Sequence, residues 1–160
     1  MTGMLLHTIR FERSLQHARE KVWRAITDPG ELAHWFPANV EGAREEGAAL
    51  RFVFRNEEGP PLDGRVLVFV PQREFEFTWD QDTLRFVLEG DTSLAFTHTF
   101  DDLEKAARDA AGWHFCLDAL EARLDGREPA AFSMERFGEL FARYAKEFGP
   151  AASKKKAPGA

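Results

Sequence analysis

The sequence predicts an α+β protein in which one curved antiparallel sheet wraps around a long helix near the C-terminus. Five segments between residues 49 and 100 alternate apolar and polar side chains with the period of two that is typical of strands. The short connections between them carry turn-forming residues, which favours an antiparallel meander. A long segment of helical periodicity, 101–126, follows directly. Because a sheet with one apolar face must bury that face, we expect the helix to pack across it.

The chain before the meander adds one strand and two short helices. Apolar side chains alternate over residues 7–15, which predicts the first strand. Residues 18–27 read as a short helix that the Asp-Pro-Gly at 28–30 ends, and residues 31–36 add another turn or two before Pro37. The first strand can return to pair within the same sheet as the meander.

The strands of the meander carry large apolar groups on one face. They are expected at residues 49–55, 64–70, 74–79, 84–89 and 93–100. In the second of them Val66, Val68 and Val70 should share a face, because side chains alternate along a strand. A space between this sheet and the long helix would suit an apolar ligand. The aromatic side chains could instead fill that space, since protein interiors pack to crystal-like density.

The long helix has two apolar faces. Phe115 points nearly away from the sheet, and Gly112 on that side would let another element come close. A second helix at about 133–148, or a partner subunit, is expected to cover this outer face. The stripe expected to face the sheet consists of Ala106, Ala110, Trp113, Leu117, Leu120 and Leu124.

Length and composition bound the rest of the molecule. Residues 1–149 are expected to form a single domain that includes the accessory helix, and residues 150–160 a disordered basic tail. The net charge of −6 argues against nucleic-acid binding, and the single cysteine excludes an intramolecular disulfide. No segment is long and apolar enough for membrane insertion, and no signal-peptide pattern is recognised at the N-terminus, so we expect a cytoplasmic protein.

His98 is the first candidate for a reactive group. It alternates with Phe96 and Phe100 on an otherwise apolar face, so it could enter a cavity. There it could act as a base together with a carboxylate such as Asp109 or Glu89. The alternative is a neutral histidine that is hydrogen-bonded to a neighbouring strand or loop.

The other candidates are weaker. His114 lies one turn from Asp118, an arrangement that can be a catalytic pair but is more often a surface pair. Cys116 lies among apolar residues, where a cysteine is usually a small core group. The histidines lack the spacing of metal ligands, and no glycine-rich phosphate loop precedes a helix. The sequence therefore predicts no catalytic residue, no metal and no cofactor.

Four stretches, in order, resemble one family. "FERSLQHAREKVWRAITDPGELAHWFP" (11–37) is similar to the opening of the bacterial proteins related to the activator of Hsp90 ATPase, in which a helix carries V-W-x-A-[LI]-T-D-P and W-F follows. "EFEFTW" resembles the middle strand of that family, and "SLAFTHTF" its penultimate strand. "GWHFCLDALEARLDG" resembles its last helix, G-W-x-x-x-L-x-x-L. The resemblance extends over about residues 8–126.

The resemblance implies a helix-grip fold of the START/Bet v 1-like (SRPBCC) superfamily, with a hydrophobic pocket between sheet and long helix. It does not fix the ligand, because one fold serves carriers, cyclases, hydrolases and co-chaperones. The first hypothesis is a small-molecule binding protein for an apolar or aromatic, lipid- or polyketide-like ligand. The expected pocket wall, in which His98 would orient the ligand, is formed by Trp35, Phe52, Phe54, Phe77, Trp79, Phe86, Phe96, His98, Trp113 and Leu117.

Two other functions and one assembly stay open. A cyclase- or hydrolase-like enzyme could use the same pocket, and a chaperone-interacting module is suggested by the family name. A homodimer is possible because the strands carry apolar groups on both faces. Those on the second face include Val53, Leu67, Phe69 and Val87.

Overall fold

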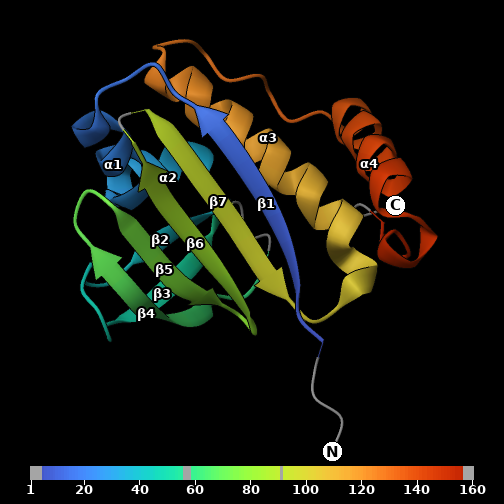
Figure 1. The fold of residues 1–160 in the computed structure, drawn as a ribbon, viewed down its shortest axis with the longest axis horizontal. Coiled ribbons are helices and arrows are strands. Elements are labelled where there is room, and N and C mark those ends of the chain that lie inside the picture. Colours follow the sequence, from blue (N-terminus) through green and yellow to red (C-terminus); the bar gives the residue numbers. More distant parts are fainter. Residues whose placement is uncertain (1–4, 56–58, 91, 157–160) are drawn as a thin grey trace, which may run out of the picture.

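A computed structural model of the chain describes residues 5–55, 59–90 and 92–156. An antiparallel sheet curves around one long helix, as the sequence predicts, and it has seven strands (Figure 1). The strand order is β1-β7-β6-β5-β4-β3-β2. The first strand therefore returns to pair with the last one. The strands are β1 His7–Ser14, β2 Ala38–Glu41, β3 Ala49–Phe54, β4 Leu62–Val70, β5 Glu74–Trp79, β6 Asp82–Glu89 and β7 Ser93–Phe100.

The helices occupy the concave side and one end of the sheet. The long helix α3 runs across the sheet, and α4 lies beside α3 (Figure 1). No helix among the described residues is both long and apolar enough to cross a bilayer. The helices are α1 Arg19–Thr27, α2 Pro29–Trp35, α3 Ala106–Leu124 and α4 Met134–Phe148, with short 3-10 turns η2 Leu103–Lys105 and η3 Pro150–Ala152.

Asp28 separates the two short helices. Its Oδ1 accepts hydrogen bonds from the backbone N–H groups of Gly30 at 2.8 Å and Glu31 at 3.2 Å, which caps α2. Pro29 follows at the first helical position, where its missing N–H has no intrahelical partner to lose. The Asp-Pro-Gly sequence therefore ends α1 and starts α2.

The ends of the long helix are also set by local sequence. Asp102 caps η2 by accepting from the Glu104 N–H at 3.2 Å, and α3 begins at Ala106. After Leu124 the chain leaves the helix, and Gly126 takes a left-handed conformation with φ of +73°. Glycine adopts that conformation without the steric cost of a Cβ. The expected helix of 101–126 is thus a 3-10 turn followed by an α-helix.

Two features of the sheet differ from the expectation. The four-residue strand β2 is not expected, because a short segment of mixed polarity carries little periodic signal. In β4 the register shifts between Val66 and Val68, which marks a β-bulge. Val66 is buried, whereas Val68 and Val70 lie opposite Glu76 and Glu74. The prediction that the three valines share a face is therefore wrong.

The end of the described chain lies against the domain. Part of the segment expected as the basic tail, residues 150–156, contacts the start of α3. Ala152 in η3 is buried, the Lys155 N–H donates to the Glu104 carbonyl at 3.0 Å, and its ammonium binds Asp102. These contacts fix this segment to the start of α3. Residues 157–160 lie outside the described residues.

The accessory helix covers the outer face of α3. Phe115 packs with Phe132, their ring centroids 5.5 Å apart, and Phe132 packs with Phe137 of α4. The expectation that a second helix covers this face is confirmed. A Cβ on Gly112, however, would meet no atom within 4 Å, so the expected close approach there is wrong. The second core beneath α4 also contains Ile9, Phe100, Ala106, Ala107, Ala110, Ala111, Leu140 and Tyr144.

Candidate functional site

The ten expected wall residues all lie in the region between the sheet and α3. Eight of them are buried; Phe54 and Trp79 are partly buried and pack against the same core. They come from elements that lie far apart in the sequence. Trp35 is on α2, and Trp113 and Leu117 are on α3. The inward positions of β3, β5, β6 and β7 supply Phe52, Phe54, Phe77, Trp79, Phe86, Phe96 and His98.

The rings among them pack directly against one another. The Phe96 ring lies 4.9 Å from Trp113 and 4.8 Å from Phe86, measured between centroids. Phe52 lies 4.9 Å from Trp79, mostly edge to face. Offset and edge-to-face contacts at these distances are favourable beyond the area they bury. The space between the sheet and α3 is therefore occupied by aromatic side chains.

Phe36 is a central ring that the expected wall omits. It is fully buried and contacts Trp79 at 5.4 Å and Trp113 at 5.7 Å between ring centroids. Phe36 follows Trp35 directly at the end of α2. If the helix continued through Phe36, the side chain would point away from the inward face. The following residue Pro37 is the available signal, because it forces the chain out of the helix there. We call Trp35, Phe36, Phe52, Phe54, Phe77, Trp79, Phe86, Phe96 and Trp113 the aromatic cluster.

The aromatic cluster reaches the surface at one edge. Phe54 at the end of β3 and Trp79 at the end of β5 are only partly buried, and their rings lie 5.9 Å apart. Cys116 and Ala119 of α3, also partly buried, pack against the same core. We call Phe54, Trp79, Cys116 and Ala119 the rim.

Gly64 in β4 makes room for this arrangement. A Cβ at this position would lie 2.6 Å from Cε2 of Phe52 and 2.6 Å from the carbonyl oxygen of Thr78. The Phe52 ring therefore occupies the space that the side chain of any residue other than glycine would need at position 64. The position demands glycine because of this close approach, which is a common reason for a glycine within a strand.

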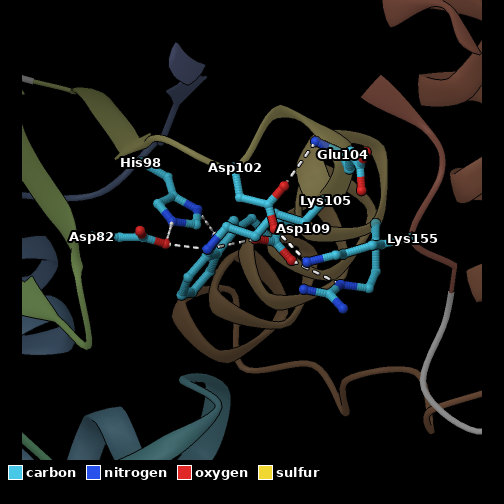
Figure 2. A network of polar contacts seen from close by, with 9 residues as sticks. Asp82, His98, Asp102, Glu104, Lys105, Asp109 and Lys155 are labelled. Atoms are coloured by element: carbon cyan, nitrogen blue, oxygen red, sulfur yellow. Dashed lines mark hydrogen bonds and ion pairs between the residues drawn. The ribbon is translucent and has the colours of Figure 1, made fainter. Parts of the chain in front are cut away.

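His98 is held at the end of the cluster by two hydrogen bonds. Its Nε2 lies 2.8 Å from Oδ2 of Asp82 in β6 (Figure 2). Its Nδ1 accepts from the indole Nε1–H of Trp113 at 2.9 Å. Because an indole nitrogen can only donate, Nδ1 must be unprotonated and Nε2 must carry the proton. His98 is therefore a neutral imidazole that donates to Asp82.

The surroundings of His98 favour this neutral form. Burial lowers the pKa of His98, and its bond to Asp82 opposes that effect only partly. Both ring nitrogens are occupied, so the imidazole cannot accept a substrate proton without losing the bond from Trp113. The alternative of a hydrogen-bonded neutral histidine is the arrangement that the structure contains.

A lysine completes the polar group at this end of the fold. The Lys105 ammonium lies 2.5 Å from Oδ2 of Asp82 and 3.8 Å from Oδ2 of Asp109 (Figure 2). Ligand atoms of Asp82, His98 and Asp109 lie within 4.8 Å of one another, a spacing that could hold a metal ion. Lys105 already supplies the cation between the two carboxylates, and the Nε2 proton of His98 blocks its lone pair. In this arrangement Lys105 forms ion pairs with both carboxylates.

Of the two carboxylates expected beside His98, Asp109 is near and Glu89 is remote. Glu89 is at the opposite end of β6 from Asp82, where it pairs with Arg10 at 3.4 Å. The carboxylate that binds His98 directly, Asp82, is not anticipated from the sequence. Asp82 starts a strand after a turn, and antiparallel pairing brings it to β7, which spacing alone does not reveal.

The remaining candidates have structural partners. His114 Nδ1 lies 2.7 Å from the Tyr144 hydroxyl, which joins α3 to α4, and its Nε2 lies 3.5 Å from Asp118. Burial lowers the pKa of His114. Burial also raises the pKa of the Cys116 thiol to about 12, so it stays protonated. Neither group has the environment of a catalytic base or nucleophile.

The curved sheet, the helix gripped in it and the aromatic cluster between them define a helix-grip protein of the START/Bet v 1-like superfamily. The family model described as activator of Hsp90 ATPase homolog 1-like protein matches residues 16–125, more than half of the chain. The chain therefore belongs to this family.

Solved structures of similar proteins agree with this assignment. A conserved protein of unknown function from Enterococcus faecalis, EF2215, superimposes with a TM-score of 0.75 at 19% identity, over 89% of this chain and 84% of that one. The protein of gene BPP1335 from Bordetella parapertussis has a TM-score of 0.65 at 26% identity, over 88% and 84%. CalU16 from Micromonospora echinospora has a TM-score of 0.65 at 23% identity, over 91% and 89%. No curated protein matches the chain.

Proposed function

We propose that this chain binds an apolar or aromatic small molecule, lipid- or polyketide-like, which enters the aromatic cluster through the rim. The observation that carries the proposal is the position of Phe54 and Trp79. Both rings belong to the cluster, yet both remain partly exposed at its edge. The family membership supports it, because the helix-grip fold offers the space between sheet and helix as a ligand site.

Ligand entry requires side chains to move, because the rings fill the interior. Trp79 is the side chain that we expect to move, and its movement breaks contacts with four neighbouring rings. It is the last residue of β5, and Asp80 in the turn after it has a left-handed φ of +55°. A rotation of the Trp79 side chain would open the rim without breaking the pairing of β5 with β4 and β6. The apolar ligand would then replace ring contacts with contacts of the same kind.

The polar groups around His98, at one end of the site, limit which kinds of ligand can bind. His98 is saturated by Asp82 and Trp113, so it offers no free hydrogen-bonding group. The charge of Lys105 beyond it is already paired with Asp82 and Asp109. We therefore do not assign His98 the role of orienting the ligand. The shape and the apolar area of the site select the ligand instead.

Fluorescence titration tests the proposal with two defined probes, 1-anilinonaphthalene-8-sulfonate and the fluorescent fatty acid cis-parinaric acid. We expect saturable binding to the folded chain and at least a tenfold weaker affinity for Trp79→Leu. Phe132→Leu is the matched control, since Phe132 is an exposed aromatic residue whose ring packs with Phe115 and Phe137 and not with the rim rings Phe54 and Trp79. Near-ultraviolet circular dichroism confirms that each variant is folded. No saturable binding of either probe, or equal loss in both variants, would overturn the proposal.

A further inference from the structure

The edge of the sheet at β1 has unused backbone hydrogen-bonding groups. The Leu15 N–H donates to the Thr92 carbonyl at 2.6 Å, directly beyond the pair of Ser14 and Ser93. Hydrogen-bonded and non-hydrogen-bonded pairs alternate in an antiparallel ladder. The odd-numbered residues of β1 therefore bond to β7, and the even-numbered residues direct N–H and C=O groups to the free edge. These are Thr8, Arg10, Glu12 and Ser14.

The backbone groups at this edge have no bonding partner within the described part of the chain, although α4 runs alongside β1. Among the described residues, β1 pairs with β7 alone, and no side chain bonds to the backbone of the four outward residues. A groove of about 220 Å³ lies between β1 and α4, where Tyr144 and Phe148 form the opposite wall. A second groove of about 290 Å³ lies between β1 and η3. An open edge of this kind is a template for another strand.

The charges on β1 are complementary to a second copy of the same strand. Arg10 and Glu12 are both exposed and lie on the same side of the strand, where they form an ion pair at 2.5 Å. When two β1 strands run antiparallel about Phe11, Arg10 of each copy lies opposite Glu12 of the other. Shifting the register by two residues in either direction places two arginines or two glutamates directly opposite each other. Opposite charges on facing strands stabilise a pair, and like charges destabilise it.

We propose that two copies of this chain associate through β1, so that their sheets continue into one another. The register about Phe11 also pairs Thr8 with Ser14 of the second copy, which gives four facing residue pairs that all direct hydrogen-bonding groups at each other. The Arg10–Glu12 alternation selects this register over its neighbours. The dimer is independent of the ligand proposal, since the rim lies on β3, β5 and α3 and not on β1.

The residues before β1 fit the same arrangement. Leu5 and Leu6 are 78% and 64% exposed, the highest values for large apolar side chains among the described residues. In the proposed register they come opposite His17 and Gln16 of the second copy. Association therefore brings two leucines that the single chain leaves in water close to the second copy.

Sedimentation velocity of the full chain from 1 to 100 µM tests the interface through charge reversal. We expect a concentration-dependent dimer in the unchanged protein. Arg10→Glu and Glu12→Arg should each weaken dimerisation by about tenfold or more, because each turns two attractive cross-strand pairs into repulsive ones. The double variant Arg10→Glu, Glu12→Arg restores both pairs with their signs exchanged. It should recover the dimer to within about threefold.

Leu67→Glu is the control for the other candidate surface, the outer face of β4. Leu67 is 37% exposed there, and its substitution should leave a dimer through β1 unchanged. Circular dichroism melting shows that every variant is folded. A monomer at all concentrations, a dimer that both charge reversals leave intact, or a dimer abolished by Leu67→Glu alone would each overturn the proposal.

Discussion

The indole of Trp113 donates a hydrogen bond to Nδ1 of His98 inside an otherwise apolar core. This bond joins the middle of α3 to β7, and the opposite nitrogen of His98 carries the link on to Asp82 in β6. One histidine thus connects the gripped helix with two strands. The same bond holds the imidazole in its neutral form, because Trp113 can only donate.

Replacing Trp113 by phenylalanine should destabilise the fold through the loss of this bond. The Nδ1 lone pair would stay buried without a donor, at a cost of about 1–3 kcal/mol beyond the loss of packing. Trp23→Phe is the matched control, since Trp23 is also buried and loses the same ring volume. Urea unfolding at pH 7 measures both. A Trp113→Phe variant no less stable than Trp23→Phe would show that the bond contributes nothing.

The neutral state of His98 makes stability depend on pH in a defined direction. Its folded pKa is below the unfolded value of about 6.5, so the unfolded chain binds more protons once pH falls below about 6.5. Stability is therefore full above that pH and declines as pH falls toward the folded pKa, by up to about 1.4 kcal/mol per pH unit for one group. His114, whose pKa burial also lowers, adds a second decline of the same sign.

Unfolding free energies at pH 5, 6 and 7 separate the two histidines. His98→Gln should be less stable at pH 7 and should show a shallower slope between pH 7 and 5 than the unchanged protein. His114→Gln should remove the other part of the slope. If the slope is the same in all three proteins, neither histidine is held neutral by burial.

The sequence predicts much of this fold because the relevant signals are local. The period-two segments, the Asp-Pro-Gly at 28–30 and Gly126 each act within a few residues, and the structure places elements where they indicate. The bulge in β4 depends instead on curvature of the whole sheet, which one strand does not encode, so Val68 and Val70 are misplaced. The contact of Asp82 with His98 and Lys105 likewise depends on pairing across strands and on the start of α3.

Gly64→Ala should destabilise the protein, because the added Cβ would overlap both Phe52 and the Thr78 carbonyl. Overpacking of this kind costs about 1–3 kcal/mol. Gly112→Ala provides the opposite case: a Cβ there meets nothing within 4 Å, and alanine is the better helix former, so stability should rise by about 0.5–1 kcal/mol. Thermal unfolding of the two variants should therefore shift in opposite directions. A neutral Gly64→Ala would show that Phe52 can move aside freely.

Cys116 should react slowly with thiol reagents despite its place at the rim. Its pKa of about 12 leaves almost no thiolate at pH 8. We expect 5,5′-dithiobis(2-nitrobenzoate) to modify the folded chain at least 100-fold more slowly than the chain in 6 M guanidinium. Rapid modification of the folded chain would indicate that the rim opens often enough to expose the thiol. Ligand binding should slow that reaction further.

The central claim, that an apolar ligand enters the aromatic cluster at the rim, is tested most directly by NMR of the four indole N–H groups. The chain is labelled with nitrogen-15 and titrated with cis-parinaric acid. We expect the signals of Trp79 and Trp113 to shift saturably, while Trp23, which packs with Phe69 away from the rim, stays unchanged. Assignment comes from the single substitutions of each tryptophan. Unmoved Trp79 and Trp113 signals at saturating probe would contradict the account.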